Sequence, residues 1–241
     1  MLAYIGIGIS LLLILLMASK EGKALADKIL LVWLLLIVCH LTLYVFSIQT
    51  ITAENVHWLL GTSIPFPMLH GPMLYLYTAA MTNQLPRNRK VLVVHFVPAI
   101  VAVLFFLPIL IKSADEKLAF IQSGGEGYQT ANLIRIILLQ VSGFVYVLWS
   151  LWLLRRHKHT IRQEFSYEER INLNWLRYFI YGLAAIWVII VVTKTDYYIF
   201  GAAAVFIVFL GFFGIRQAGI FTTANLYKTV PVAGNAEAAI P

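Results

Sequence analysis

Residues 29–48 read ILLVWLLLIVCHLTLYVFSI, a stretch of 20 residues that contains no charged side chain. A helix of roughly 20 apolar residues is long enough to cross the hydrocarbon core of a bilayer. Inside a bilayer the backbone must satisfy its own hydrogen bonds, which a helix does within one segment. The stretch therefore predicts a transmembrane helix, and the fold class depends on how often the chain repeats this pattern.

Six other apolar runs have a similar character. They cover residues 2–17, 57–81, 91–111, 131–154, 175–192 and 197–215. Hydrophobic residues make up 61% of the chain and charged residues only 12%, whereas soluble domains carry about 25% charged residues. We therefore predict an all-α, polytopic membrane protein, a bundle of about seven transmembrane helices. Residues 193–196 leave room for only a tight turn, so the last two helices are expected to be antiparallel neighbours.

The basic residues predict how the bundle is oriented. Thirteen of the 18 Lys and Arg residues follow the first, third, fifth and seventh runs, and three lie in the loops on the opposite side. Cytoplasmic loops of membrane proteins are enriched in Lys and Arg. The N-terminus is thus predicted to lie outside and the C-terminus in the cytoplasm. We attribute the formal net charge of +7 to this topology and not to nucleic-acid binding.

Motifs for enzymatic chemistry are missing from the sequence. It contains no nucleotide-binding glycine loop, no zinc-protease helix motif and a single cysteine, Cys39. No Asp or Glu lies within any of the seven runs. We therefore expect neither an enzyme nor a bound cofactor or metal ion.

Three histidines lie within the apolar runs, where polar side chains are costly and often functional. His40 and His70 come from consecutive antiparallel helices and reach a similar depth near the middle of the bilayer, whereas His95 lies near a helix end. We predict that His40 and His70 face each other across a ligand cavity, with Tyr44 and Tyr75 about one turn away. The alternative for each histidine is a neutral imidazole that hydrogen-bonds a neighbouring helix.

The third run contains Pro65, Pro67 and Pro72. A proline inside a helix removes a backbone donor and kinks the helix. We predict that these prolines bend the third helix and open a pocket beside His70. The alternative is a static bend that only serves packing.

Arg135 lies about one turn into the fifth run, on the side predicted to be external. It is a candidate for attracting an anionic ligand, and Asn132 and Gln140 share its helix. The alternative is that its side chain extends to the membrane surface. The candidate ligand-binding residues are His40, His70, Tyr75 and Arg135.

Three segments resemble a bacterial membrane module. They are residues 66–77 (FPMLHGPMLYLY), 165–177 (FSYEERINLNWLR) and 211–221 (GFFGIRQAGIF). The module is the multi-helix N-terminal region of membrane-bound AraC-type transcriptional regulators, common in Bacteroidetes-like bacteria. The resemblance implies a sensor in the bacterial inner membrane, formed by residues 1–221, that passes an external or membrane signal to a cytoplasmic helix-turn-helix domain.

Residues 222–241 depart from that family, because they are too few for such a DNA-binding domain. We expect them to form a cytoplasmic tail or the start of a linker, so DNA is contacted only through a missing domain or a partner. The expected partners are the lipid bilayer and an unidentified small-molecule or membrane signal, and a homodimer is left open. The alternative functions are a small transporter or permease subunit and, third, an intramembrane enzyme.

Overall fold

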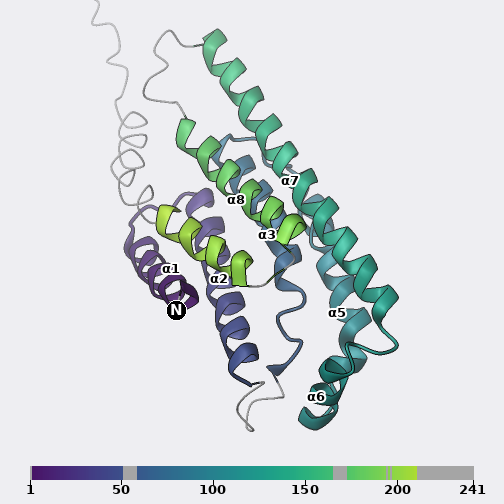
Figure 1. The fold of residues 1–241 in the computed structure, drawn as a ribbon. Helices are drawn as coiled ribbons and strands as arrows, with labels where there is room; N and C mark the ends of the chain where they lie inside the picture. The colour runs from purple at the N-terminus through teal and green to yellow at the C-terminus, as the bar shows by residue number, and fades with distance from the viewer. Residues whose placement is uncertain (1, 51–58, 165–172, 194, 196, 211–241) are drawn as a thin grey trace, which may run out of the picture.

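The computed structural model describes residues 2–50, 59–164, 173–193, 195 and 197–210, and every regular element in this part is a helix (Figure 1). The helices are α1 (Leu2–Ser19), α2 (Leu25–Thr50), α3 (Phe66–Met81), α4 (Arg89–Val94), α5 (Val97–Leu110), α6 (Ala114–Gln122), α7 (Gln129–Glu164), α8 (Asn174–Thr193) and an unlabelled helix, Tyr197–Leu210. The all-α prediction is confirmed for the described residues.

Four of the described helices, α1, α2, α7 and α8, are long and apolar enough to cross a membrane. A fifth crossing results if α5 and α6 are counted as one span, although the chain bends by 107° between them. Large apolar side chains are exposed along these helices, including Leu15 on α1, Leu148 on α7 and Val192 on α8. Such surfaces match the hydrocarbon of a bilayer, because a helix that is apolar on all faces suits a lipid or core environment.

The hairpin between α1 and α2 is closed by one buried carboxylate. Asp27, in the first turn of α2, accepts hydrogen bonds from the Ala24 backbone N–H (2.8 Å) and the Lys20 ammonium (2.7 Å). Acidic groups near a helix N-terminus are stabilised by the unpaired N–H groups there. Asp27 therefore ends the turn and starts the second helix.

Helix α3 lies at the centre of the bundle, packed between α2 and α7, and ten of its 16 residues are buried. Its C-terminus forms a Schellman motif, in which Asn83 has a positive φ of 55° and the Gln84 N–H donates to the Ala79 carbonyl at 2.8 Å. The Gln84 side-chain amide also donates to the Leu153 carbonyl of α7 (2.9 Å). These bonds fix the end of α3 against α7.

The prediction of one helix over residues 57–81 with three internal prolines is wrong in part. Residues 59–65 form turns, and α3 begins at Phe66, with Pro65 at its N-cap and Pro67 in its first turn. Proline is favoured at a helix start because the N–H that it lacks has no helical partner there. Only Pro72 lies inside the helix, where it is buried. Residues 51–58 lie outside the described part.

The run 91–111 is divided into α4 and α5 at His95 and Phe96. Pro98 explains this break, because it has no N–H to donate to the Val94 carbonyl four residues earlier. The amphipathic helix α6, which the sequence analysis did not predict, begins with a capping box formed by Ser113 and Glu116.

Helix α7 is the longest helix of the described residues, and its C-terminal end projects past α8 (Figure 1). It has 36 residues, whereas the apolar run from which it was predicted covers only residues 131–154. At 1.5 Å per residue it is about 54 Å long, well beyond the roughly 30 Å of a hydrocarbon core. Its C-terminal part, which contains Arg155, Arg156 and Lys158, therefore extends past the apolar region.

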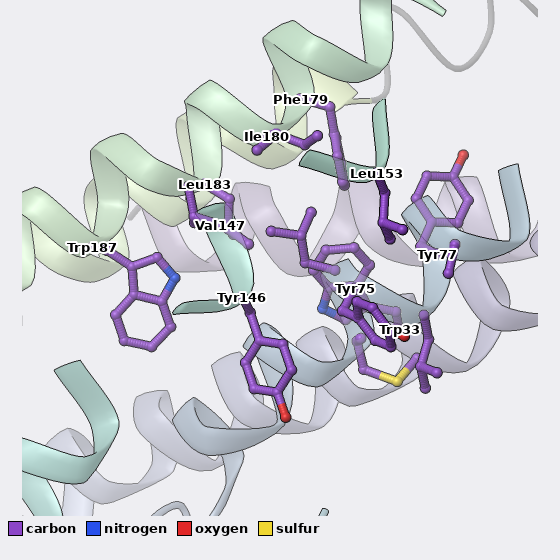
Figure 2. Close-up of a cluster of buried hydrophobic side chains, with 14 of the residues drawn as sticks. Trp33, Tyr75, Tyr77, Tyr146, Val147, Leu153, Phe179, Ile180, Leu183 and Trp187 are labelled. Atoms are coloured by element: carbon purple, nitrogen blue, oxygen red, sulfur yellow. The ribbon is translucent and has the colours of Figure 1, made fainter. Parts of the chain in front are cut away.

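The core combines aromatic rings with aliphatic side chains (Figure 2), and three of its aromatic rings pack closely against glycines of neighbouring helices. A Cβ atom built on Gly143 of α7 would lie 2.3 Å from the Trp187 ring of α8. Similar close approaches pair Gly71 with Tyr146 at 2.7 Å and Gly182 with Phe206 at 2.7 Å. The three contacts join α3 to α7, α7 to α8, and α8 to helix 197–210. Close packing of this kind replaces the hydrophobic effect as a cause of helix association in lipid.

We predict that Gly143→Ala lowers the free energy of unfolding by about 1–3 kcal/mol, because the new methyl group overlaps the Trp187 indole and forces repacking. Thermal unfolding of the detergent-purified protein, followed by fluorescence-detected size exclusion, measures the effect. Gly8→Ala on α1 is the matched control, since a Cβ there meets nothing within 4 Å. Equal stability of the two variants would contradict the role assigned to the Gly143–Trp187 contact.

Candidate functional site

A cavity of about 500 Å³ lies between α2, α3, α7, α8 and helix 197–210, and it is lined mainly by apolar side chains. This volume is within the range of about 300–1,000 Å³ that is usual for small-molecule sites. The polar or hydrogen-bonding side chains in its lining are few: Trp33, His40, Tyr44, Ser63, His70, Arg135, Gln140 and Trp187. The lining residues of α7 lie near its start and those of α8 near its end, so the cavity occupies the half of the bundle nearer to α6.

A chain of hydrogen bonds crosses from α2 to α3 and back at the cavity wall. The Trp33 indole Nε1–H donates to His70 Nδ1 at 3.2 Å, and His70 Nε2 lies 3.0 Å from His40 Nδ1. Trp33 and His40 are seven residues apart on α2, which places them on one face of the helix. Both side chains therefore turn into the bundle, but they contact each other directly, whereas the sequence analysis expected them to face each other across a cavity.

The chemistry of Trp33 determines the direction of these bonds. An indole N–H is a donor only, so His70 Nδ1 must be the unprotonated acceptor. The proton of the neutral His70 ring is then on Nε2, which donates to His40 Nδ1. His40 must in turn carry its proton on Nε2, and no hydrogen bond of that nitrogen is recorded among the described residues. The chain therefore leaves the proton of His40 on Nε2, and His40 is one of the residues that line the cavity.

Aromatic rings hold His40 in place. Its ring stacks on Phe66 with a centroid distance of 5.6 Å and meets Phe200 edge-on at 5.2 Å. Tyr44, one turn further along α2, stacks on the opposite side of this cluster against Phe200 at 3.4 Å. The position of the imidazole is therefore set by α3 and by helix 197–210 together.

Arg135 also lines the cavity, on α7, as the sequence analysis predicted for a residue that attracts a ligand. Its guanidinium donates through Nε (3.1 Å) and Nη2 (2.8 Å) to the Asn132 side-chain oxygen, one turn earlier. Gln140, on the same helix, lines the cavity as well. Asn132 thus holds the guanidinium, although Asn132 itself is exposed and does not line the cavity.

Tyr75 does not lie at the cavity, contrary to the sequence prediction. Five residues along a helix correspond to a rotation of about 140°, so Tyr75 points away from the side that His70 faces. It packs instead against His95 and Trp149, with centroid distances of 4.7 and 4.5 Å. His95 Nδ1 lies 2.9 Å from the Tyr146 hydroxyl in this second, buried cluster.

The prolines that were predicted to open the pocket take different positions. Pro67 lines the cavity from the first turn of α3, where it causes no kink. Pro65 precedes the helix, and Pro72 is buried inside it without lining the cavity. The pocket beside His70 therefore depends on where α3 begins and not on a bend produced by three prolines.

Trp187 is a lining residue that sequence reasoning missed. Its side chain is 4% exposed, and its indole Nε1–H is buried without a hydrogen-bond partner in the described part of the chain. Tryptophans of membrane proteins prefer the interfaces. The sequence did offer one signal: Trp187 lies in the second half of an apolar run but several residues before its end, away from the position that an interfacial tryptophan would take.

No family model, curated protein or solved structure matches the chain. Among the described residues, no group of three or more His, Cys, Asp or Glu side chains is placed to hold a metal ion. The arrangement at the cavity supports non-covalent binding, because apolar walls with a few convergent polar groups are the usual form of such sites.

We predict that Trp33→Phe destabilises the protein by about 1–3 kcal/mol, because His70 Nδ1 is left buried without its donor. The midpoint of thermal unfolding in detergent measures the loss. Trp152→Phe on α7, whose ring is 52% exposed, applies the same change outside the core. A Trp33→Phe midpoint equal to that of Trp152→Phe would show that the bond adds nothing to stability.

Proposed function

We propose that the chain is a membrane-embedded sensor module that binds a small molecule in the cavity and passes the binding event to the cytoplasm. The observation that carries this proposal is the directed hydrogen-bond chain from Trp33 through His70 to His40, which ends at a cavity inside the bundle. A buried polar network at membrane depth is costly and therefore marks a functional position. Ligand contact with five helices at once offers a route from occupancy to a change in helix packing.

The proposed topology has seven crossings, with the N-terminus outside. In this arrangement α3 is one crossing, α4 and α5 together form another, and helix 197–210 is the last. The distribution of Lys and Arg supports the orientation, because thirteen of these 18 residues then belong to the cytoplasmic side. The cavity lies in the half of the bundle nearer to the outside, and the basic end of α7 lies in the cytoplasm.

The proposed output is transcriptional, on the strength of the resemblance to membrane-bound AraC-type regulators. A helix-turn-helix domain or partner protein makes the DNA contact, and the chain itself operates in the bacterial inner membrane, alone or as a homodimer. A small transporter or permease subunit is the second candidate, and the cavity is the observation that favours it.

The topology predicts opposite results for two reporter fusions. A reporter that is active only in the cytoplasm is expected to be active when it follows Gln217 and silent when it is inserted between Ser123 and Gly124. Quantitative immunoblots of the membrane fraction control for expression. The reverse pattern would invert the orientation, and activity at both sites would exclude an odd number of crossings between them.

The sensor proposal is tested in host cells without any added ligand. Deletion of the gene is expected to change a defined set of transcripts, and a chromosomal His70→Ala variant is expected to change the same set, because it removes the centre of the hydrogen-bond chain. Trp152→Phe should leave these transcripts at wild-type levels. RNA sequencing gives the readout, and immunoblots verify that each variant reaches the membrane.

Two outcomes would contradict this proposal. In the first, cells that carry His70→Ala at a normal level in the membrane keep wild-type transcript levels. This result would show that the cavity does not control the output. Transcripts that return to normal when one solute is supplied to the deletion strain would favour the transporter.

A further inference from the structure

Helix α7, which lies at one side of the bundle (Figure 1), carries a row of exposed apolar side chains that ends at basic ones. The apolar positions follow one another at alternating steps of four and three residues, which places them on one face of the helix. They are Ile134, Leu138, Val141, Val145, Leu148 and Trp152. The same face continues with the exposed residues Arg155, Arg156 and His159. We call these residues together the α7 lane.

The apolar part of the α7 lane has about the length of a hydrocarbon core. From Ile134 to Trp152 the helix rises about 27 Å, and the core of a bilayer is roughly 30 Å thick. Trp152 marks the interface, where tryptophan rings of membrane proteins are enriched. Arg155 and Arg156 follow about one turn later, at the depth of the lipid head groups. Along its axis the α7 lane therefore matches a bilayer in the order hydrocarbon, interface and head group.

The side chains at the basic end of the α7 lane are neighbours in space. The Arg156 guanidinium lies over the Trp152 ring, 5.5 Å from the ring centroid, in a cation–π contact. A phenyl ring can make the same contact, so Trp152→Phe keeps it. His159 is three residues from Arg156 and four from Arg155, the spacings at which side chains on a helix surface meet. Two guanidiniums and an imidazole thus lie within one turn of each other beside an interfacial ring.

The charges of Arg155 and Arg156 are directed away from the protein. Both side chains are exposed, and neither forms an ion pair within the part of the chain that the structure describes. Lys158, on another face of the helix, donates instead to the Asn174 side chain of α8 at 2.7 Å. A planar guanidinium matches the geometry of a phosphate, to which it donates two parallel hydrogen bonds. The exposed end of the α7 lane therefore suits a phosphate group at the membrane surface.

We infer that the α7 lane binds an anionic phospholipid, with the phosphate at Arg155 and Arg156 and the acyl chains along the apolar part of the lane. Basic residues beside a membrane helix attract acidic lipids, whereas the cation of a zwitterionic head group offsets its phosphate. His159 adds a donor, because a neutral imidazole has one N–H in either tautomer. The lipid site is separate from the cavity and requires only that α7 crosses a bilayer, so it goes beyond the proposed function without resting on it.

A second copy of the chain fits the α7 lane less well than a lipid does. Two copies in one membrane have the same orientation, so a symmetric contact through the lane would place Arg155 and Arg156 against the same residues of the other copy. Helix contacts in membranes are also enriched in small residues, whereas the apolar part of the lane consists of Ile, Leu, Val and Trp. A water-soluble partner would have no use for the apolar part.

Native mass spectrometry of the full chain in detergent, titrated with dioleoyl phosphatidylglycerol or dioleoyl phosphatidylcholine, tests the site. The two lipids share their acyl chains and a phosphate, but only phosphatidylglycerol carries a net charge. We expect the wild type to prefer phosphatidylglycerol. Arg155→Gln combined with Arg156→Gln should weaken phosphatidylglycerol binding by roughly tenfold or more and leave phosphatidylcholine binding nearly unchanged. Lys28→Gln combined with Lys90→Gln is the matched control, because it removes two charges from exposed side chains of α2 and α4.

A second readout uses the wild type in vesicles and needs no variant. Phosphatidylglycerol with a diazirine near its head group should label residues 148–159 more strongly than phosphatidylcholine with the same diazirine. An excess of inorganic phosphate should leave this labelling unchanged, because free phosphate lacks the acyl chains that the lane contacts. Equal losses of affinity in the two double variants would indicate a diffuse attraction of charge and overturn the site. Wild-type affinity in the arginine variant, or equal labelling by the two lipids, would overturn it as well.

Discussion

The indole N–H of Trp33 has to find its acceptor within the protein, because Trp33 is buried and an unpaired buried donor is costly. His70 is that acceptor, and this single bond has consequences at three levels. It ties α2 to the central helix α3. It determines which nitrogen of His70, and then of His40, carries a proton. It also fixes two of the side chains that line the cavity, His40 and His70, relative to each other.

The cavity exists because packing elsewhere in the bundle is close. Gly71 and Gly143 bring aromatic rings against the backbones of α3 and α7, so these helices meet with little space between them. Lipid gives no hydrophobic force for helix association, so contacts of this kind hold the bundle together. Where no ring packs on a glycine, open space remains. Its walls are aliphatic side chains and polar groups that already bond one another.

Sequence reasoning predicted the helical class from apolar length. It also placed His40 and His70 at similar positions on consecutive helices, but it expected a cavity between two rings that in fact bond each other directly. It placed Tyr75 wrongly, because depth alone ignores the rotation of about 140° that five residues add. It also missed the division between α4 and α5, which one proline in the fourth run causes.

Trp187 was beyond reach for a different reason. The Trp187 indole N–H is buried without a partner because the ring packs against Gly143 of another helix, 44 positions earlier in the chain. Rotation and local breaks are readable from sequence by counting residues, whereas a tertiary contact of this kind requires the packed structure.

Trp187 is also the residue through which occupancy of the cavity reaches the rest of the bundle. It belongs to the cavity wall and, at the same time, rests on Gly143, less than one turn from Gln140 on α7. Packed helices have discrete arrangements, so a small shift at such a contact moves a whole element and does not fade within a few residues. Helix α7 passes the cavity at Arg135 and continues from there for nearly 30 residues to Glu164. An occupant of the cavity that displaces the Trp187 ring therefore acts on α7, the longest helix among the described residues.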